Sequence, residues 1–291
     1  MTGTDSIQSM NQHEYAAFEK ATTDDTILSK DGFWWRQVRK GFFRPLCPFF
    51  PMRKALGRDA KPFGIVQYAL SDPAQSNSIL NMIMFDHPER YDLAGLPGDV
   101  RRSVRRAREH AMTVERIADP DILIKHGGSV YQSFVKRTGY VYDKKRLDAS
   151  YFKRWIRTLY DYPKIRVHGV FREGNLVSFM IEALVEDVLV IKAMINAPDA
   201  LKLHAPDLQL HHARMRAKEH GRIRTIYNGY YAQVQGLNKF KLHRGADLWF
   251  QPARIDAPFP VLGMIQWLFP EQSRYLKGFG EQELIPSREP N

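Results

Sequence analysis

The chain has 291 residues, of which 44% are hydrophobic, 12% aromatic and 26% charged, and this length predicts about two structural units. The composition excludes wholesale disorder, a collagen-like fibre and a small disulfide scaffold. Forty-three Lys and Arg against 32 Asp and Glu leave a net charge of +11. This charge favours polyanionic partners: RNA, nucleotide phosphates or an anionic membrane surface.

The first 25 residues are polar and partly acidic, and we expect a loose or partly helical lead-in. They lack the basic start and the apolar run of a signal peptide. No stretch of the chain approaches the roughly 20 apolar residues that cross a bilayer. Cys47 is the single cysteine, so an intramolecular disulfide cannot form. We therefore expect a cytoplasmic location, where thiols stay reduced.

Residues 1–62 combine this lead-in with a basic, aromatic arm. Pro45, Pro48 and Pro51 forbid one long helix in the arm. Its composition suits a stacking surface for nucleic acid or an interfacial membrane anchor. The plainer interpretation, which we favour, is an irregular arm whose rings pack onto the core. The aromatic residues of this region are Phe33, Trp34, Trp35, Phe42, Phe43, Phe49, Phe50 and Phe63, and the cations between them are Arg36, Arg39, Lys40, Arg44, Arg53, Lys54, Arg58 and Lys61.

Residues 63–163 predict two strands, at 63–70 and 78–85, followed by a helix at 98–111 with Asp99 as its N-cap. The polar face of this helix is cationic, with Arg101, Arg102, Arg105, Arg106 and Arg108. Like charges four residues apart repel one another, which indicates a face that binds an anion. The alternative is a solvated face whose arginines pair with acids elsewhere. A strand at 113–117 and helices at 119–137 and 150–160 complete this half.

Residues 164–255 are predicted to alternate strands with helices, and residues 256–291 form a tail with a helix at 261–268. Asp207 is the expected cap of the central helix and Gly221 its C-terminal glycine. The order of elements indicates an α/β (α+β) fold in which a mixed sheet is flanked by helices. The expected strands are 164–171, 176–185, 188–195, 223–227 and 248–252, and the expected helices are 208–220 and 233–243.

Several kinds of chemistry are excluded by missing motifs. The chain has no phosphate-binding P-loop, no dinucleotide-binding glycine fingerprint, no H-E-x-x-H and no G-x-S-x-G elbow. His211 and His212 are neighbours on a helix and point about 100° apart, so they do not converge on one metal. We interpret them as surface and groove residues, and we expect no metal site.

Lys241 is a candidate functional residue because of its position in the predicted fold. Lys241 lies on the helix that follows the strand ending in Tyr227, Asn228 and Gly229. An Asn-Gly kink at the carboxyl end of a strand exposes backbone N–H groups where open α/β sheets place ligands. A cation on the next helix can lie beside a developing oxyanion or a phosphate. Such a site works without a covalent nucleophile, by holding an activated acyl group near an amine.

The residues around this lysine carry a family resemblance. The helix ends in Ala217-Lys-Glu-His-Gly221, the next strand in Tyr227-Asn-Gly229, and the segment Gly236-Leu-Asn-Lys-Phe-Lys-Leu-His-Arg-Gly245 follows. With these motifs, residues 165–252 resemble the C-terminal domain of the Fem-type peptidyltransferase-like branch of the GNAT superfamily. The arginine helix adds a weaker match to the R-R-x-x-R-x-A helix of these proteins. The matches cover about half of the chain.

The resemblance implies an acyltransferase that acts on an amine, with a GNAT-like mixed sheet and two GNAT-like halves at 63–163 and 164–255. Lys241 matches the family lysine, which implies contact with donor phosphate or with the reacting carbonyl. Arg244 stands where the family has an aromatic residue, and Asn228 where it has an acid. The candidate catalytic residues are Lys241, Tyr227 and Asn228, and the candidate substrate-binding residues are Tyr230, Arg244, Arg101, Arg102, Arg105 and Arg106.

The donor implied by the resemblance is either aminoacyl-tRNA or acyl-CoA. Acetyl-CoA-binding relatives cradle pyrophosphate with a glycine-rich loop before the central helix. Residues 197–206 contain no glycine here, and Pro198 and Pro206 each remove an N–H. We therefore favour tRNA, and acyl-CoA or an acyl carrier is the alternative. The expected acceptor is an amine-bearing small molecule, a peptide or a cell-envelope precursor. Peripheral membrane contact and a silent binding module stay open; DNA is not an expected partner.

Overall fold

The computed structural model describes residues 7–140, 142–231, 235–258, 260–268 and 270–284. Contacts group them into two compact units, each assembled from separate segments. Unit 1 comprises Met1–Asp24, Met84–Gly229 and Val234–Asp247, and unit 2 comprises Asp25–Ile83, Tyr230–Gln233 and Leu248–Asn291. The four segments that the sequence suggests, with boundaries at 62, 163 and 255, stay a prediction.

Unit 1 contains a mixed sheet. From the edge inward, β7 to β10 pair antiparallel with their neighbours, and β10 pairs parallel with β11, with Val190 beside Tyr227. The short β1 (Ser9–Met10) adds to β9 in parallel. This arrangement confirms the predicted mixed sheet and most of its strands. The strands in chain order are β7 (Met112–Arg116), β8 (Ile165–Arg172), β9 (Asn175–Val185), β10 (Val188–Asn196) and β11 (Thr225–Tyr230).

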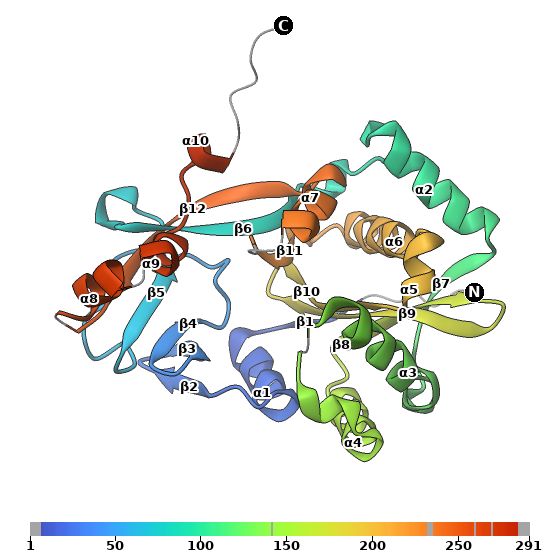
Figure 1. Cartoon of the computed structure of the whole chain (residues 1–291), viewed down its shortest axis with the longest axis horizontal. Coiled ribbons are helices and arrows are strands. Elements are labelled where there is room, and N and C mark those ends of the chain that lie inside the picture. The colour runs from blue at the N-terminus through green and yellow to red at the C-terminus, as the bar shows by residue number, and fades with distance from the viewer. Residues whose placement is uncertain (1–6, 141, 232–234, 259, 269, 285–291) are drawn as a thin grey trace, which may run out of the picture. The chain divides into compact units, whose positions relative to one another are not determined.

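Helices cover both faces of this sheet. Figure 1 shows α2 and α6 on one side of β8, β9 and β10, and α3 and α4 on the other. Because both faces are covered, the side chains of β9 are almost all buried. The helices of this unit are α1 (Gln12–Thr22), α2 (Gly98–Glu109), α3 (Pro120–Thr138), α4 (Ala149–Tyr160), α5 (Pro198–Lys202), α6 (Ala205–His220) and α7 (Gln235–His243). Short 3-10 turns occupy Pro73–Gln75, Pro88–Arg90, Leu93–Gly95 and Lys144–Leu147.

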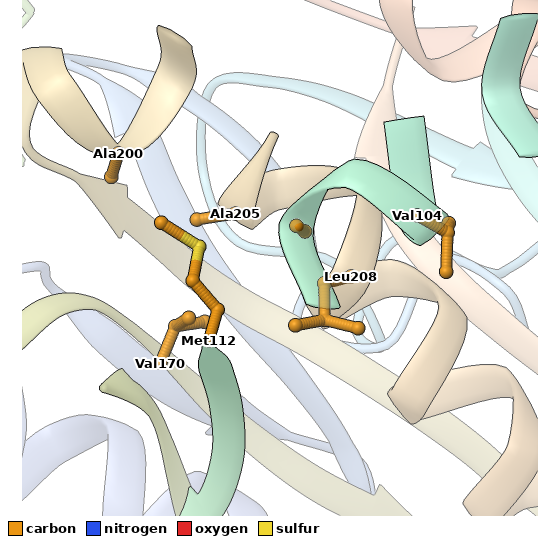
Figure 2. Close-up of a cluster of buried hydrophobic side chains, with 7 residues drawn as sticks. Val104, Met112, Val170, Ala200, Ala205 and Leu208 are labelled. Atoms are coloured by element: carbon orange, nitrogen blue, oxygen red, sulfur yellow. The ribbon is translucent and has the colours of Figure 1, made fainter. Parts of the chain in front are cut away.

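A buried cluster fixes α2 on unit 1. Figure 2 shows Val104 of α2, Leu208 of α6 and Met112 of β7 within it, together with Val170 and the small residues of α5 and α6. Val104 and Ala107 are spaced one turn apart, so α2 packs one apolar stripe inward. The arginines of α2 occupy the opposite, exposed face.

Unit 2 contains a second set of paired strands. β3 pairs antiparallel with both β2 and β4, β4 runs parallel to β5, and β5 pairs antiparallel with β12. Trp35, Tyr68 and Leu70 are fully buried between them. Three strands, β6, β11 and β12, contribute residues to both units. The elements are β2 (Ile27–Lys30), β3 (Phe33–Arg39), β4 (Phe42–Pro45), β5 (Ile65–Ala69), β6 (Ser78–Asp86), β12 (Asp247–Asp256), α8 (Val261–Leu268), α9 (Pro270–Lys277) and α10 (Glu281–Leu284).

The aromatic arm differs from the sequence expectation. It is not irregular, because β2, β3 and β4 form a meander through it. The turns between these strands contain Gly32 and Gly41, both with positive φ, as tight hairpins require. The expected packing of rings onto a core is confirmed for Trp35, Phe43 and Phe49. Phe63 is the exception, because its side chain is exposed.

Two predicted helix caps are also wrong. Pro97, not Asp99, occupies the N-cap of α2, and Asp99 lies in the first turn. His204 takes the N-cap position of α6, and Asp207 is a buried residue of its first turn. Gly221 does end α6 with a φ of 70°, as predicted. Within the described part of the chain, the structure shows no helix with the length and apolar character needed to span a bilayer.

Candidate active site

The candidate site is built around Lys241. Asn238 and Lys241 lie one turn apart on α7, and both side chains are buried. The helix ends at Gly245, whose φ of 75° lets the Ala246 N–H donate back to the Lys241 carbonyl. The ammonium Nζ of Lys241 donates to the backbone carbonyl of Asn228 at 2.5 Å. The end of β11 is thereby joined to α7.

The backbone beside Lys241 is unusual. Gly229 has a φ of 94°, and a Cβ there would lie 3.7 Å from Lys241 Nζ. The kink expected at Asn228-Gly229 is therefore present, although it lies within β11 and not after it. Asn228 is buried, and its side-chain Nδ2 has no hydrogen-bond partner. β11 thus supplies an amide donor without a partner, and α7 supplies an ammonium group bound to the carbonyl of the same residue.

The charge of Lys241 has no compensating acid. Among the described residues no carboxylate lies within ion-pair distance of Nζ, and the side chain is only 9% exposed. Burial lowers the pKa of Lys241 from 10.5 to about 8. The group is still mainly protonated at neutral pH. A buried cation of this kind interacts strongly with an oxyanion or a phosphate, because little water screens it.

Arg244 holds α7 against α6. Its Nε donates to Asp207 at 2.8 Å, and its guanidinium stacks on the Phe240 ring with 3.7 Å between the carbon Cζ and the ring centroid. The arginine thus replaces the family's aromatic residue with an ion pair and a cation–π contact. Its predicted role in substrate binding stays a prediction.

The arginine helix lies next to α7. Asp99 in the first turn of α2 and His243 in the last turn of α7 are 2.7 Å apart. Arg105 pairs with Glu109 at 3.3 Å on the helix surface. Arg101, Arg102 and Arg106 are exposed, and none of them has an ion-pair partner among the described residues. The alternative in which acids from elsewhere neutralise this face therefore does not apply to these three.

A buried arginine was missed by sequence reasoning. Arg214 on α6 is 4% exposed, and its Nε and one terminal nitrogen have no hydrogen-bond partner. Its guanidinium lies over the rings of Phe85 and Tyr91, at 3.6 and 5.1 Å. Burial lowers the pKa of Arg214 to about 10, and a Cβ at Gly245 would lie 3.8 Å from one of its nitrogens. An arginine in a polar helical stretch gives no signal of such burial in sequence.

Comparisons with known proteins address the fold of this site. Neither the protein-family models nor the curated protein sequences contain a match to the chain. Among solved structures the chain is similar to the C-terminal domain (DUF2156) of a putative lysylphosphatidylglycerol synthetase from Agrobacterium fabrum, with 11% identity, a TM-score of 0.58 and coverage of 88% of this chain and 91% of that chain. The corresponding values for FemX are 11%, 0.57, 88% and 93%. For L-PGS from Bacillus licheniformis they are 13%, 0.58, 93% and 99%.

The chain therefore shares the Fem-type fold of FemX and of the lysylphosphatidylglycerol synthetase domains. The resemblance inferred from Lys241 and its neighbours is thereby confirmed at the level of fold, as is the predicted mixed sheet. At these identities the likeness concerns the fold, and the roles of individual residues rest on their own geometry.

In this Fem-type fold the start of α6 is not open to a phosphate. Ala205 and Leu208, in its first turn, are buried in the cluster under α2 and α5. Asp207 in the same turn is buried and pairs with Arg244, so this ion pair occupies the helix end. The segment 197–206, expected to be a connection, contains the short α5. Its geometry supports the view that no pyrophosphate cradle exists at this helix end.

The two tyrosines of the candidate site are placed differently. Tyr227 is half-buried on β11 in unit 1. Tyr230 belongs to unit 2, where its ring lies 4.5 Å from the guanidinium carbon of Arg44. The structure thus brings Tyr227, Asn228 and Lys241 into one unit. A role for Tyr230 at the acyl site stays a prediction.

The paired histidines face different neighbours, as the helical geometry predicts. His211 lies 2.8 Å from the Tyr91 hydroxyl and 3.0 Å from Arg108, and His212 contacts Arg216. His211 is buried, so its interpretation as a surface residue is wrong; tertiary contacts from α2 and the Tyr91 segment cover it. No group of three or more His, Cys, Asp or Glu side chains arranged to hold a metal occurs within the described ranges.

Proposed function

We propose that the protein is an acyltransferase that moves an aminoacyl group from aminoacyl-tRNA to an amine. One observation carries the proposal: Lys241, buried without an acid, is held by α7 at the kinked end of β11. A structural lysine would be expected to pair with a carboxylate or to reach solvent. A buried cation at the kinked end of a strand instead suits a site where negative charge develops.

The proposed chemistry is direct transfer. The lone pair of the acceptor amine attacks the ester carbonyl of the donor, and a new C–N bond forms. The carbonyl oxygen takes up negative charge, which the Lys241 ammonium and the Asn228 amide stabilise. The ester C–O bond then breaks, and the amine proton passes to the ribose oxygen that leaves. Tyr227 and Tyr230 line the acyl group, and most of the rate gain comes from orientation.

The choice of tRNA as donor rests on where free cations lie. Arg101, Arg102 and Arg106 form an exposed cationic face that α2 presents next to α7. Such a face suits the phosphates of an acceptor stem. The start of α6, where an acyl-CoA pyrophosphate would be cradled, is buried and is occupied by the ion pair of Asp207 with Arg244. Acyl-CoA or an acyl carrier is therefore the second donor to be tested.

The acceptor is proposed to be an amine on a cell-envelope precursor, a peptide or a small molecule. Two of the structural neighbours are named for FemX and for lysylphosphatidylglycerol synthesis. The second name describes the joining of lysine to a lipid, and it supports an envelope acceptor for this chain by analogy of fold.

The decisive experiment follows a label from donor to acceptor. The protein is incubated with a mixture of radiolabelled aminoacyl-tRNAs and an extract of envelope precursors. We expect ribonuclease-sensitive transfer of label by the wild type. Lys241→Met should reduce the rate about 100-fold or more, as loss of an oxyanion donor does. Lys239→Met, an exposed lysine of the same helix, is the matched control and should keep the wild-type rate.

Thermal stability separates the two donors. A ligand at about 100 times its Kd adds about 2.7 kcal/mol to the free energy of unfolding. Stabilisation by bulk tRNA, abolished by ribonuclease, agrees with the proposal. Stabilisation by CoA without any effect of tRNA would replace it with the acyl-CoA enzyme. Unchanged transfer in Lys241→Met would remove Lys241 from the mechanism.

A further inference from the structure

Unit 2 exposes large apolar side chains. Trp267 and Met264 of α8 are 82% and 53% exposed, and Leu268 is exposed to a similar degree. Residues 264, 267 and 268 are spaced by three and four, so they share one face of the helix. Phe63, which precedes β5, is 86% exposed. Exposed apolar side chains gathered on one helix face mark an interaction site more often than scattered single residues do.

The strand register places these residues at one end of unit 2. Asp256 at the end of β12 pairs with Val66 at the start of β5. The chain enters α8 soon after Asp256, and Phe63 lies just before Val66, so both leave the β5–β12 pair at the same end. Figure 1 shows α8 and α9 packed side by side near β5. The apolar end of unit 2 is defined here as Phe63, Met264, Trp267 and Leu268.

A basic segment leads to this end. The Leu56 N–H donates to the Tyr68 hydroxyl, and Lys61 pairs with Asp256 at 2.8 Å, so residues 53–61 run alongside β5 towards Phe63. The segment contains four cations and one acid, Asp59. The cations that are exposed and have no ion-pair partner among the described residues are Arg53, Lys54 and Arg58.

We infer that the apolar end of unit 2 docks the protein on an anionic phospholipid membrane. The eight residues of α8 include no charged side chain, and an exposed tryptophan prefers the region between headgroups and acyl chains. The nearby cations are attracted by anionic headgroups. Nucleic acid is the less suitable occupant, because Met264 and Leu268 add nothing to base stacking. This inference does not depend on the proposed transfer reaction.

The test is sedimentation with lipid vesicles. We expect the full chain to bind vesicles of phosphatidylcholine with phosphatidylglycerol, and to bind pure phosphatidylcholine weakly. Trp267→Ser with Met264→Ser should lower vesicle binding about tenfold or more, since apolar burial carries it. Lys54→Gln with Arg58→Gln should lower it about 25-fold, at about fivefold for each charge. The intrinsic fluorescence of Trp267, taken as wild type minus Trp267→Phe, should shift to the blue.

Matched controls come from unit 1. Ile122→Ser replaces another exposed apolar residue and Lys125→Gln another exposed cation, both on α3, and both should bind vesicles as the wild type does. Equal binding by the Trp267 variant would overturn the inference. So would a loss of tRNA affinity in the Lys54 and Arg58 variant without any loss of vesicle binding. Unchanged thermal unfolding of each variant shows that exposed positions were altered without loss of fold.

Discussion

Burial of Lys241 lowers the free energy of unfolding at neutral pH. The ammonium leaves water and finds one carbonyl and no carboxylate in the described structure. Natural proteins keep such a group where activity requires it, at a cost in stability. The same holds for Arg214, whose guanidinium is stacked between rings with two nitrogens unpartnered. These two cations mark the site more sharply than any local motif does.

Lys241→Met should therefore stabilise the protein. The lowered pKa corresponds to about 3 kcal/mol of charge burial, of which about 1 kcal/mol is offset when the Asn228 carbonyl loses its donor. We expect a net gain of about 2 kcal/mol in urea unfolding at pH 7. Between pH 8 and 10.5 the unfolded chain binds more protons at this group than the folded chain, so wild-type stability rises with pH. Above about pH 10.5 the charge no longer contributes, and the variant should be about 1 kcal/mol less stable than the wild type because the Asn228 carbonyl still lacks its donor.

Lys239→Met provides the comparison for this measurement. Its side chain is exposed on the same helix, so its stability should stay within about 0.5 kcal/mol of the wild type. If Lys241→Met is less stable than the wild type at pH 7, the hydrogen bond of the ammonium group stabilises the fold by more than the burial of its charge costs.

At the scale of single elements, α2 has one face that packs on the core and one that is exposed. Its inner stripe, Val104 and Ala107, is buried on α6. Its outer face carries Arg101, Arg102 and Arg106, which have no acid partner among the described residues. The pairing of Asp99 with His243 joins the start of α2 to the end of α7. The exposed arginine face is therefore joined to the helix that carries Lys241.

Arg101→Gln with Arg102→Gln should weaken tRNA binding without altering the fold. Each lost phosphate contact reduces the slope of log affinity against log salt concentration by about one. We expect a slope smaller by about two in filter-binding measurements at several salt concentrations. Lys153→Gln with Arg154→Gln, two exposed cations of α4, is the matched control. Equal slopes for both double variants would mean that α2 does not contact tRNA.

At the scale of the whole molecule, buried histidines set the response to acid. Burial lowers the pKa of His211 to about 4, with Arg108 and Arg214 adding to the effect. Burial lowers the pKa of His212 to about 4 as well, with Arg216 and His168 adding to it and Glu182 opposing it. Both rings are neutral in the folded protein at pH 5, whereas the unfolded chain is protonated there.

The free energy of unfolding should therefore fall as pH falls from 6.5 to 4. Two histidines with lowered pKa values make the loss a few kcal/mol across this window. Urea unfolding at pH 7 and pH 5 measures this loss. His212→Gln should lose less stability than the wild type, because the slope of the free energy of unfolding against pH falls by the contribution of about one proton. His126→Gln on α3 is the control and should keep the wild-type slope. A wild type equally stable at both pH values would contradict this account.

The sequence by itself determined the elements whose signals are local. The antiparallel strands β8 and β9, expected at 164–171 and 176–185, and the end of α6 at Gly221 depend on residues a few positions apart. The resemblance that identifies Lys241 is also local, because its motifs follow one another within residues 217–245. The meander in the arm was not predicted, although Gly32 and Gly41 mark its turns, because Pro45, Pro48 and Pro51 exclude a long helix without indicating which strands pair.

The tertiary structure decided which charged side chains are paired and which are buried. Asp207 and Asp99 have the sequence context of helix caps, yet Asp207 pairs with Arg244 and Asp99 with His243, both distant in the chain. Arg214 and His211 are buried only because Phe85, Tyr91 and α2 cover them. Helix and strand periodicity depends on neighbours within a turn, whereas burial, pKa and ion pairing depend on segments that only folding brings together.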